Sequence, residues 1–292
     1  VTTSLLSDDG RADFVAAHQK EYEQLRRLHG TPRVKLVPLA AARENRPHLS
    51  FGTAEVPVPE LTGVRVLNDV PLSTLREYID WTPFFHTWEL KGVYPRIFEH
   101  ETYGAAARQL FAEGNALLDK IIERRWLSVR GVYAFFPANS VGDDVELYTD
   151  ASRKQVLEHF HFLRQQGVKE KGEPNRSLSD FIAPKGSGAA DHLGAFAVTS
   201  GIGLKELVER FKAEHDDYNA IMAEALADRL AEAFAEYLHQ LARREWGYGR
   251  DEDLSSEDLI REKYRGIRPA AGYPACPDHT EKATLWKLLD VE

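Results

Sequence analysis

The chain has 292 residues, of which 43% are hydrophobic and 28% charged, and its formal net charge is −9. A chain of this length buries a substantial core, so the composition indicates a globular protein with one large domain and an appendage. The acidic balance argues against nucleic acid as the main partner, because Lys and Arg are spread along predicted helices. No apolar run approaches the ~18 residues of a membrane span, and no signal peptide opens the chain. The single cysteine excludes an internal disulfide and makes the cytoplasm the expected location.

The first predicted helix lies in residues 1–30. Ser7 and Asp8 are suitable N-cap residues, basic residues occupy the last turn, and Gly30 provides a stop. Residues 31–70 are rich in proline and show little periodicity, which predicts an extended linker. We therefore expect the helix to belong to a preceding domain.

The rest of the chain alternates between helix and strand patterns. Apolar residues recur at helical spacing in some segments, and apolar runs bounded by turn residues predict strands in others. Strands joined in hairpins, with helices in blocks, predict an α+β domain on a largely antiparallel sheet. In the first half of the domain we expect a helix at 73–81, a helix at 103–126 and a strand that begins at residue 130. The second helix has Leu110, Leu117, Leu118 and Ile121 on one face, and the strand ends in a loop at Pro137, Asn139 and Gly142. After it we expect a hairpin at 143–166 that turns at 149–153, a strand at 192–201, a helical region at 204–246 broken near His215, and a helix at 280–292.

Two features suggest a piece of a longer protein. Met222 is the only methionine and does not open the chain. The last predicted helix runs to Glu292 without a Gly or Pro stop. We expect further sequence on both sides.

The segment GIRPAAGYPACPDHTEK, residues 266–282, combines an Arg, two Gly, three Pro, the cysteine and a His. Cys276 and His279 suggest either a thiol nucleophile or a metal site. Catalytic Cys–His pairs are normally joined by the fold rather than by adjacency, and a metal needs three or four convergent ligands. The pattern therefore favours a loop that holds a ligand through its backbone and through the planar guanidinium of Arg268.

Three further patterns each have a structural interpretation that we favour. His159 and His161 share one face of a predicted strand, a spacing compatible with metal but also with half-exposed surface histidines. The acids of HDDY, residues 215–218, are suited to capping a helix start. Gly201 and Gly203 follow a strand, but the third glycine of a dinucleotide-binding loop is missing, so we expect a turn.

Four segments closely resemble the C-terminal activation region of cobalamin-dependent methionine synthase. They read YIDWTPFFHTWELKGVYPRIF, RGVYAFFPANSVGDDVELYTD, AEHDDYNAIMAEALADRLAEAFAEYLH and LIREKYRGIRPAAGYPACPDHTEKATLWKLLDVE. LLSDDGRADFVAAHQKEYEQLRRLHG is similar to the end of that enzyme's cobalamin-binding domain. The resemblance implies the last helix of a cobalamin-binding domain at 1–30, a linker at 31–70, and an activation domain at 71–292 that in the family continues further.

The resemblance also implies a fold and a ligand site. It implies a C-shaped domain with a curved, largely antiparallel sheet flanked by helices, which binds S-adenosylmethionine without a Rossmann fold. In this reading Arg268 meets the ligand carboxylate, and acidic residues meet its ammonium. The family's ligand residues match Asp80, Glu232, Glu262, Arg268, Ala270 (through its backbone) and Tyr273.

The function implied by the resemblance is repair of a methyltransferase of methionine biosynthesis. The module positions the methyl of S-adenosylmethionine for reductive methylation of cob(II)alamin held on a neighbouring domain, and no side chain is expected to act in catalysis. The partners are the cobalamin-binding domain of the same polypeptide and a flavodoxin or flavoprotein reductase. Cobalamin and zinc are expected only in other domains of the parent enzyme, and neither a membrane nor nucleic acid is expected as a partner. The alternative is a docking module for the reductase and the cobalamin domain that binds no ligand of its own.

Overall fold

The computed structural model describes residues 5, 10–30, 35–52, 56–68 and 70–291, with the backbone alone at 28–30. Ser7 and Asp8, the expected N-cap residues, lie outside the described residues. The chain divides into two compact units, Val1–His48 with Arg164–Ser177, and Leu49–Leu163 with Leu178–Glu292. No helix of the described part of the chain combines the length and the apolar character needed to cross a membrane.

The smaller unit contains helices α2 (Arg11–Gly30) and α3 (Leu39–Glu44). Backbone hydrogen bonds join the residues before α3 to a later segment, from Val37 N to Gln166 O and from Val168 N to Lys35 O, each at 2.8 Å. Beyond α3, the Asn45 Nδ2 donates to Asn175 Oδ1 at 2.8 Å. Part of the expected linker therefore pairs with residues 164–177. The domain boundaries at residues 30 and 70 stay a prediction.

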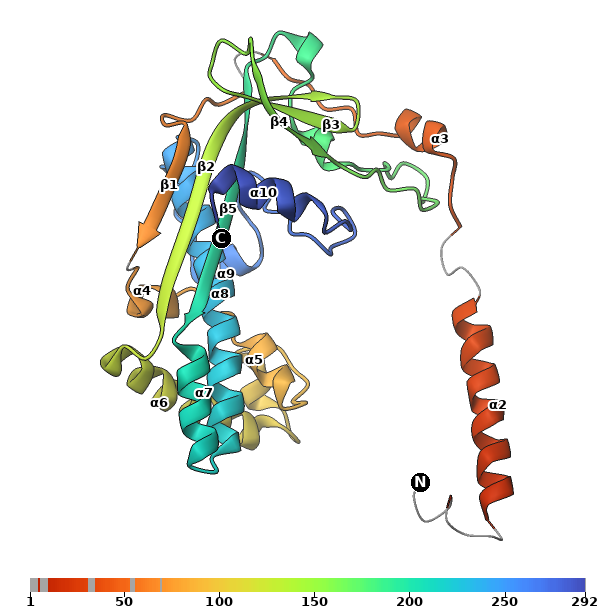
Figure 1. Cartoon of the computed structure of the whole chain (residues 1–292), viewed down its shortest axis with the longest axis vertical. Helices are drawn as coiled ribbons and strands as arrows, with labels where there is room; N and C mark the ends of the chain where they lie inside the picture. Colours follow the sequence, from red (N-terminus) through yellow and green to blue (C-terminus); the bar gives the residue numbers. More distant parts are fainter. Residues whose placement is uncertain (1–4, 6–9, 31–34, 53–55, 69, 292) are drawn as a thin grey trace. The chain divides into compact units, whose positions relative to one another are not determined.

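The larger unit is built on a five-stranded antiparallel sheet (Figure 1). The strand order is β1-β2-β3-β4, and β5 pairs with β2. Figure 1 shows β2 bending along its length, so the predicted α+β class with a curved antiparallel sheet is confirmed. The strands are β1 (Gly63–Asn68), β2 (Ser128–Val141), β3 (Asp144–Tyr148), β4 (Val156–His161) and β5 (Asp191–Ile202).

The sheet differs from the prediction in two places. The hairpin of β3 and β4 forms as expected, but β1 lies inside the segment expected to be a linker and pairs with β2. The strand β2 also runs through Pro137 and Asn139, where we expected a loop, and Pro137 lies opposite His192 of β5. The Asn139 side chain donates to the carbonyls of Ala183 and Ala189, which holds this part of β2 in place.

The strand β2 is buried on both faces. Val132, Ala134, Phe136 and Ala138 alternate onto one face and pack with Leu289 of helix α10 (Glu281–Leu289). The residues between them, Tyr133 and Phe135, pack on the other face against Leu238 of helix α8 (Asp217–Trp246). Successive side chains of a strand point to opposite faces. Because β2 is covered on both faces, its sequence is a continuous apolar run and does not alternate between apolar and polar residues.

Helix α8 approaches the sheet at Gly131 of β2. A Cβ atom at this position would lie 2.7 Å from Cζ of Phe234, which is itself fully buried. A contact this short requires a shift of the neighbour, and a fully buried ring has little room to shift. Glycine at this position thus allows the close approach of α8.

The helices of the larger unit follow the predicted pattern only in part. The helix expected at 73–81 ends at Arg76, and Asp80 instead accepts from Thr82 N at the start of the next helix. The short helices at Thr82–Thr87 and Ser256–Ile260 were not expected.

The expected apolar face of α6 is buried, and the helical region breaks at His215, whose φ is 58°. Asp216 then caps α8 by accepting from Asn219 N at 3.0 Å, and Gly203 forms the expected turn before α7. The last helix ends at Leu289, before a left-handed Asp290, rather than running to the end of the chain. The helices not yet given bounds are α4 (Leu72–Arg76), α5 (Thr82–Thr87), α6 (Gly104–Arg124), α7 (Leu204–Ala213) and α9 (Ser256–Ile260), with short 3-10 helices at Arg96–Glu99, Leu178–Phe181 and Lys185–Ser187.

Candidate functional site

Arg268 contacts two acids of helix α8. Its Nη2 lies 2.7 Å from Oε2 of Glu236, and its Nη1 lies 3.4 Å from Oε1 of Glu232. Residues four apart on a helix lie on the same face, so α8 presents both carboxylates to one guanidinium. The Glu236 side chain is 10% exposed and that of Glu232 is 57% exposed. The short, buried contact with Glu236 is therefore the stronger of the two.

This pair leaves one donor and one acceptor unused. Nε of Arg268 and Oε1 of Glu236 are both buried and have no hydrogen-bond partner within the described part of the chain. Buried polar atoms are nearly always hydrogen-bonded, because an unpaired one costs about 1–3 kcal/mol. Two such atoms on one ion pair indicate a site for a polar group that supplies both an acceptor and a donor.

The charges of the pair influence both pKa values. Burial raises the pKa of the Glu236 carboxyl above its ordinary value, and the positive charges of Arg268 and Arg243 offset this effect only in part. Burial alone would lower the pKa of Arg268, but the Glu236 and Glu232 carboxylates outweigh it and raise the pKa. The guanidinium is therefore held in its charged form.

A second buried arginine, Arg243, lies about two turns beyond Glu236 along α8. Arg243 is fully buried, and its Nε lies 3.0 Å from each carboxylate oxygen of Glu252. Its Nη1 lies 3.0 Å from Nδ1 of His239, and its Cζ is 4.1 Å from the ring centroid of Tyr264. Because arginine only donates, Nδ1 of His239 is the acceptor. These contacts fix the chain around Tyr264, four residues before Arg268.

The loop after Arg268 is closed by its own backbone. Gly272 N donates to Cys276 O at 2.8 Å, and Cys276 N donates to Tyr273 O at 2.9 Å. Burial raises the pKa of the Cys276 thiol, and the carboxylates of Asp278 and Glu281 raise it further. The side chain is thus a neutral thiol, unsuited to nucleophilic attack. Within the described ranges no group of three or more His, Cys, Asp or Glu side chains is placed to hold a metal ion.

The predicted ligand residues are only partly brought together. Glu232 and Arg268 meet, whereas Asp80, Glu262 and Tyr273 make no side-chain hydrogen bond or ion pair with Arg268 in the part of the chain that the structure describes. Asp80 is partly buried and accepts from Thr82 N at 2.9 Å, at the start of α5. The remaining three, Glu262, Ala270 and Tyr273, are exposed. Their role as ligand residues stays a prediction.

Glu236 was missed by the sequence reasoning, although a signal was available. It lies four residues after Glu232 in LAEAFAEYL, so a helical pattern places both on one face. Its burial follows from its position on α8 between Phe234 and Leu238, which belong to the core. A buried acid on the same face as a predicted ligand acid is a candidate site residue.

The histidine pair of β4 is a surface feature, as expected. Both residues are exposed, and their rings stack at a centroid distance of 6.2 Å. Nδ1 of His161 lies 3.1 Å from Oδ1 of Asp144 on the paired strand. This arrangement is a cross-strand contact on the open face of a hairpin.

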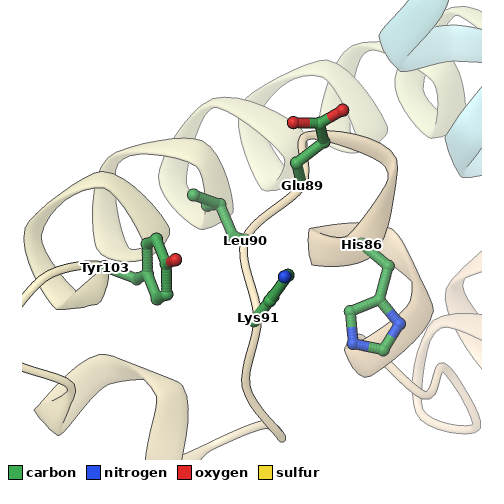
Figure 2. A pocket seen from close by; sticks show the side chains of 5 residues that line it. All are labelled: His86, Glu89, Leu90, Lys91 and Tyr103. Carbon is green, nitrogen blue, oxygen red and sulfur yellow. The ribbon is translucent and has the colours of Figure 1, made fainter.

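A pocket of about 590 Å³ lies elsewhere in the larger unit (Figure 2). It contains none of the predicted ligand residues. Figure 2 shows the pocket lined by His86 of α5, by the chain just after α5 and by Tyr103, which precedes α6. The lining residues are His86, Glu89, Leu90, Lys91 and Tyr103.

The candidate site is a buried ion pair between helix α8 and the loop at Arg268, rather than an activated nucleophile. The chain belongs to the family of activation domains of vitamin B12 dependent methionine synthase, whose model matches residues 71–292. A solved structure described as the crystal structure of the MetH reactivation domain bound to AdoHcy is similar, with a TM-score of 0.82 and 54% identity. The match covers 89% of this chain and 79% of that one. The resemblance seen in the sequence is thereby confirmed.

Proposed function

We propose that this chain is the reactivation module of a cobalamin-dependent methionine synthase. It binds S-adenosylmethionine and positions its methyl group for the reductive methylation of cob(II)alamin held on a neighbouring domain. The parent enzyme transfers a methyl group from methyltetrahydrofolate to homocysteine. The observation that carries the proposal is the buried pair of Arg268 and Glu236 with one unused donor and one unused acceptor. The MetH reactivation domain that resembles this chain is bound to AdoHcy, the demethylated form of the same ligand.

The cluster fits the chemistry of S-adenosylmethionine. The amino-acid end of the ligand carries a carboxylate, which Arg268 binds through parallel N–H donors, and an ammonium, which acidic side chains bind. Two carboxylates around one guanidinium leave an excess of negative charge. This excess suits a ligand whose sulfonium adds a further positive charge. When bound, the ligand supplies an activated methyl group on that sulfonium.

The residues of this chain bind and orient the ligand and perform no proton transfer. Holding the methyl group in line with its acceptor speeds the transfer, because the entropy cost of bringing the two groups together has already been met by binding. The sequence lacks the Asp-x-His-x-x-Gly motif for cobalamin, and one cysteine is too few for a thiolate zinc site. We therefore place cobalamin and zinc in other domains of the parent enzyme. A flavodoxin or flavoprotein reductase supplies the electron in the cytoplasm.

A docking module without a ligand of its own is the alternative. Such a module needs an exposed surface for its partners and has no use for a buried ion pair with two unsatisfied atoms. The Arg268 and Glu236 pair is buried and unsatisfied. This observation favours ligand binding over docking alone.

A calorimetric titration of the chain with S-adenosylmethionine tests the proposal. We expect one ligand per chain and no consumption of the ligand during the experiment. S-adenosylhomocysteine, which keeps the amino-acid end, is expected to bind at the same site. Absence of binding for both ligands to the folded chain would contradict the proposal.

A further inference from the structure

The two carboxylate oxygens of Glu236 have different surroundings. Oε2 accepts from Nη2 of Arg268 at 2.7 Å, whereas Oε1 is buried and has no partner among the residues that the structure describes. A carboxylate that served only to neutralise Arg268 would gain most by using both oxygens in a fork-to-fork contact. Arg268 still has an unused Nε, so this contact is not made. Oε1 is thus left for another donor.

Glu232 is less well placed for a strong contact. Its side chain is more than half exposed and lies 3.4 Å from the guanidinium at its nearest oxygen. Exposed ion pairs contribute about 0–1 kcal/mol because water screens them. Glu236 is largely withdrawn from water, and a charged hydrogen bond there is correspondingly stronger.

The unused atoms match one chemical group. An α-amino acid carries an acceptor, its carboxylate, and a donor, its ammonium, on the same carbon atom. Among the residues that the structure describes, Nε of Arg268 has no acceptor and Oε1 of Glu236 has no donor. One amino-acid end can therefore satisfy both buried atoms.

We propose that Glu236 is a ligand-binding residue, with Oε1 accepting from the ligand ammonium while Oε2 holds Arg268 for the ligand carboxylate. This inference rests on the proposed function. It adds a fourth side chain to Asp80, Glu232 and Arg268 at the amino-acid end, and it gives Glu236 the role of the buried ammonium acceptor. The exposed Glu232 then contributes the weaker, screened attraction.

The surroundings of Glu236 hold it in place for this role. Arg268 forms an ion pair with Glu236, and Arg243 adds a second positive charge nearby. Arg243 is itself fixed by Glu252 and by His239. These positive charges favour the charged form of Glu236 and offset part of the effect of its burial.

The test compares two ligands in two chains. The ligands are S-adenosylhomocysteine and its analogue that lacks the α-amino group but keeps the carboxylate. In Glu236→Gln we expect affinity for S-adenosylhomocysteine to fall about tenfold or more, as for loss of a charged hydrogen bond. We expect affinity for the analogue to change by less than about threefold, because it has no ammonium to lose and the glutamine oxygen can still accept from Nη2 of Arg268.

The controls separate the possible outcomes. Glu224→Gln, an exposed glutamate of the same helix, should bind both ligands as the parent chain does. If Glu236→Gln weakens both ligands by the same factor, or neither, the inference is wrong while the proposed function stands. If the folded parent chain binds neither ligand, the proposed function itself fails. Should Glu236→Gln not fold, Glu236→Asp, which keeps the charge and retracts the oxygens, takes its place, with the same selective loss expected.

Discussion

Arg243 belongs to helix α8 and Arg268 lies against that helix. Both are largely withdrawn from water, but they differ in what surrounds them. Arg243 is fully buried, with Glu252 on its Nε, His239 on its Nη1 and the Tyr264 ring beneath it. Arg268 has one close acid, one distant acid and the Tyr264 hydroxyl beside it, and its Nε has no hydrogen-bond partner among the described residues. Nη2 of Arg243 makes no hydrogen bond within the described residues, but it lies 2.9 Å from Oε2 of Glu252. Every guanidinium nitrogen of Arg243 therefore faces a partner, whereas Nε of Arg268 faces none among the described residues.

The difference separates a structural arginine from a binding one. Burial and an acidic partner are common to both, so neither property alone identifies a site. The distinguishing property is the set of donors and acceptors that the protein leaves unused. Four predictions follow the contrast between these two arginines, from the largest expected effect to the smallest.

Replacing Arg243 is expected to destabilise the fold strongly. Arg243→Met leaves Glu252 without its partner in a poorly solvated place, so the free energy of unfolding should fall by about 3–5 kcal/mol. Urea denaturation measures the loss. The control is Arg261→Met, which breaks an exposed pair with Glu257 and should cost less than about 1 kcal/mol. Equal losses in the two variants would show that burial of Arg243 has no energetic consequence.

Replacing Arg268 is expected to weaken ligand binding more than it weakens the fold. Arg268→Ala should lose on the order of 1.5–3 kcal/mol of binding free energy for S-adenosylmethionine, and Arg268→Lys less, because lysine keeps the charge without the planar fork. S-adenosylhomocysteine has the same carboxylate and should lose as much. Calorimetry with each ligand checks this. Unchanged affinity of Arg268→Ala for both ligands would refute the assignment.

Acid should destabilise the protein through His239. Burial first, then the charges of Arg243 and Arg268, lower its pKa to about 3. An unfolded histidine titrates near pH 6.5, so below that pH the unfolded chain binds more protons and stability falls as pH falls. The slope for one group is at most about 1.4 kcal/mol per pH unit.

The variant His239→Gln isolates this contribution, since glutamine keeps an acceptor for Arg243. Its free energy of unfolding should depend less on pH between 6.5 and 4, measured by urea denaturation at several pH values. His192, whose pKa burial lowers to about 4, acts in the same direction and leaves a residual slope. An identical slope in the parent and the variant would mean that His239 is protonated in the folded state.

Replacing Cys276 should have the smallest effect. Its thiol is neutral and half-buried, and the loop is closed by backbone hydrogen bonds that serine preserves. Cys276→Ser should change the binding free energy of S-adenosylmethionine by less than about 0.5 kcal/mol. Reactivation in the parent enzyme should be nearly unaffected as well. A loss of more than about tenfold in either measurement, with the fold preserved, would show that the thiol takes part.

The sequence predicts those elements whose pattern is set by burial. The face of α6 and the hairpin of β3 and β4 were found because their apolar spacing follows the period of the element. The strand β1 was not found, because Val64 and Val66 are exposed at the sheet edge and prolines precede them. The end of α10 was missed since Asp290, rather than the usual glycine, adopts the left-handed conformation there.

The site was predictable only in part. The resemblance supplied Arg268 and Glu232, which the structure brings together. Glu236 carries no motif of its own, and its importance depends on burial and on one unpaired oxygen, which a sequence does not show. The spacing of four residues predicts that Glu236 lies on the same helix face as Glu232, but it does not predict how far Glu236 is exposed to solvent.

The close approach of α8 to the sheet at Gly131 has a consequence for genetic variation. Phe234, which a side chain at position 131 would push, lies on α8 midway between Glu232 and Glu236. A substitution there would displace the turn of helix that carries both acids, although position 131 is a hundred residues away in the sequence. In a survey of missense alleles scored by ligand affinity, Gly131 would therefore rank beside the residues of the cluster itself.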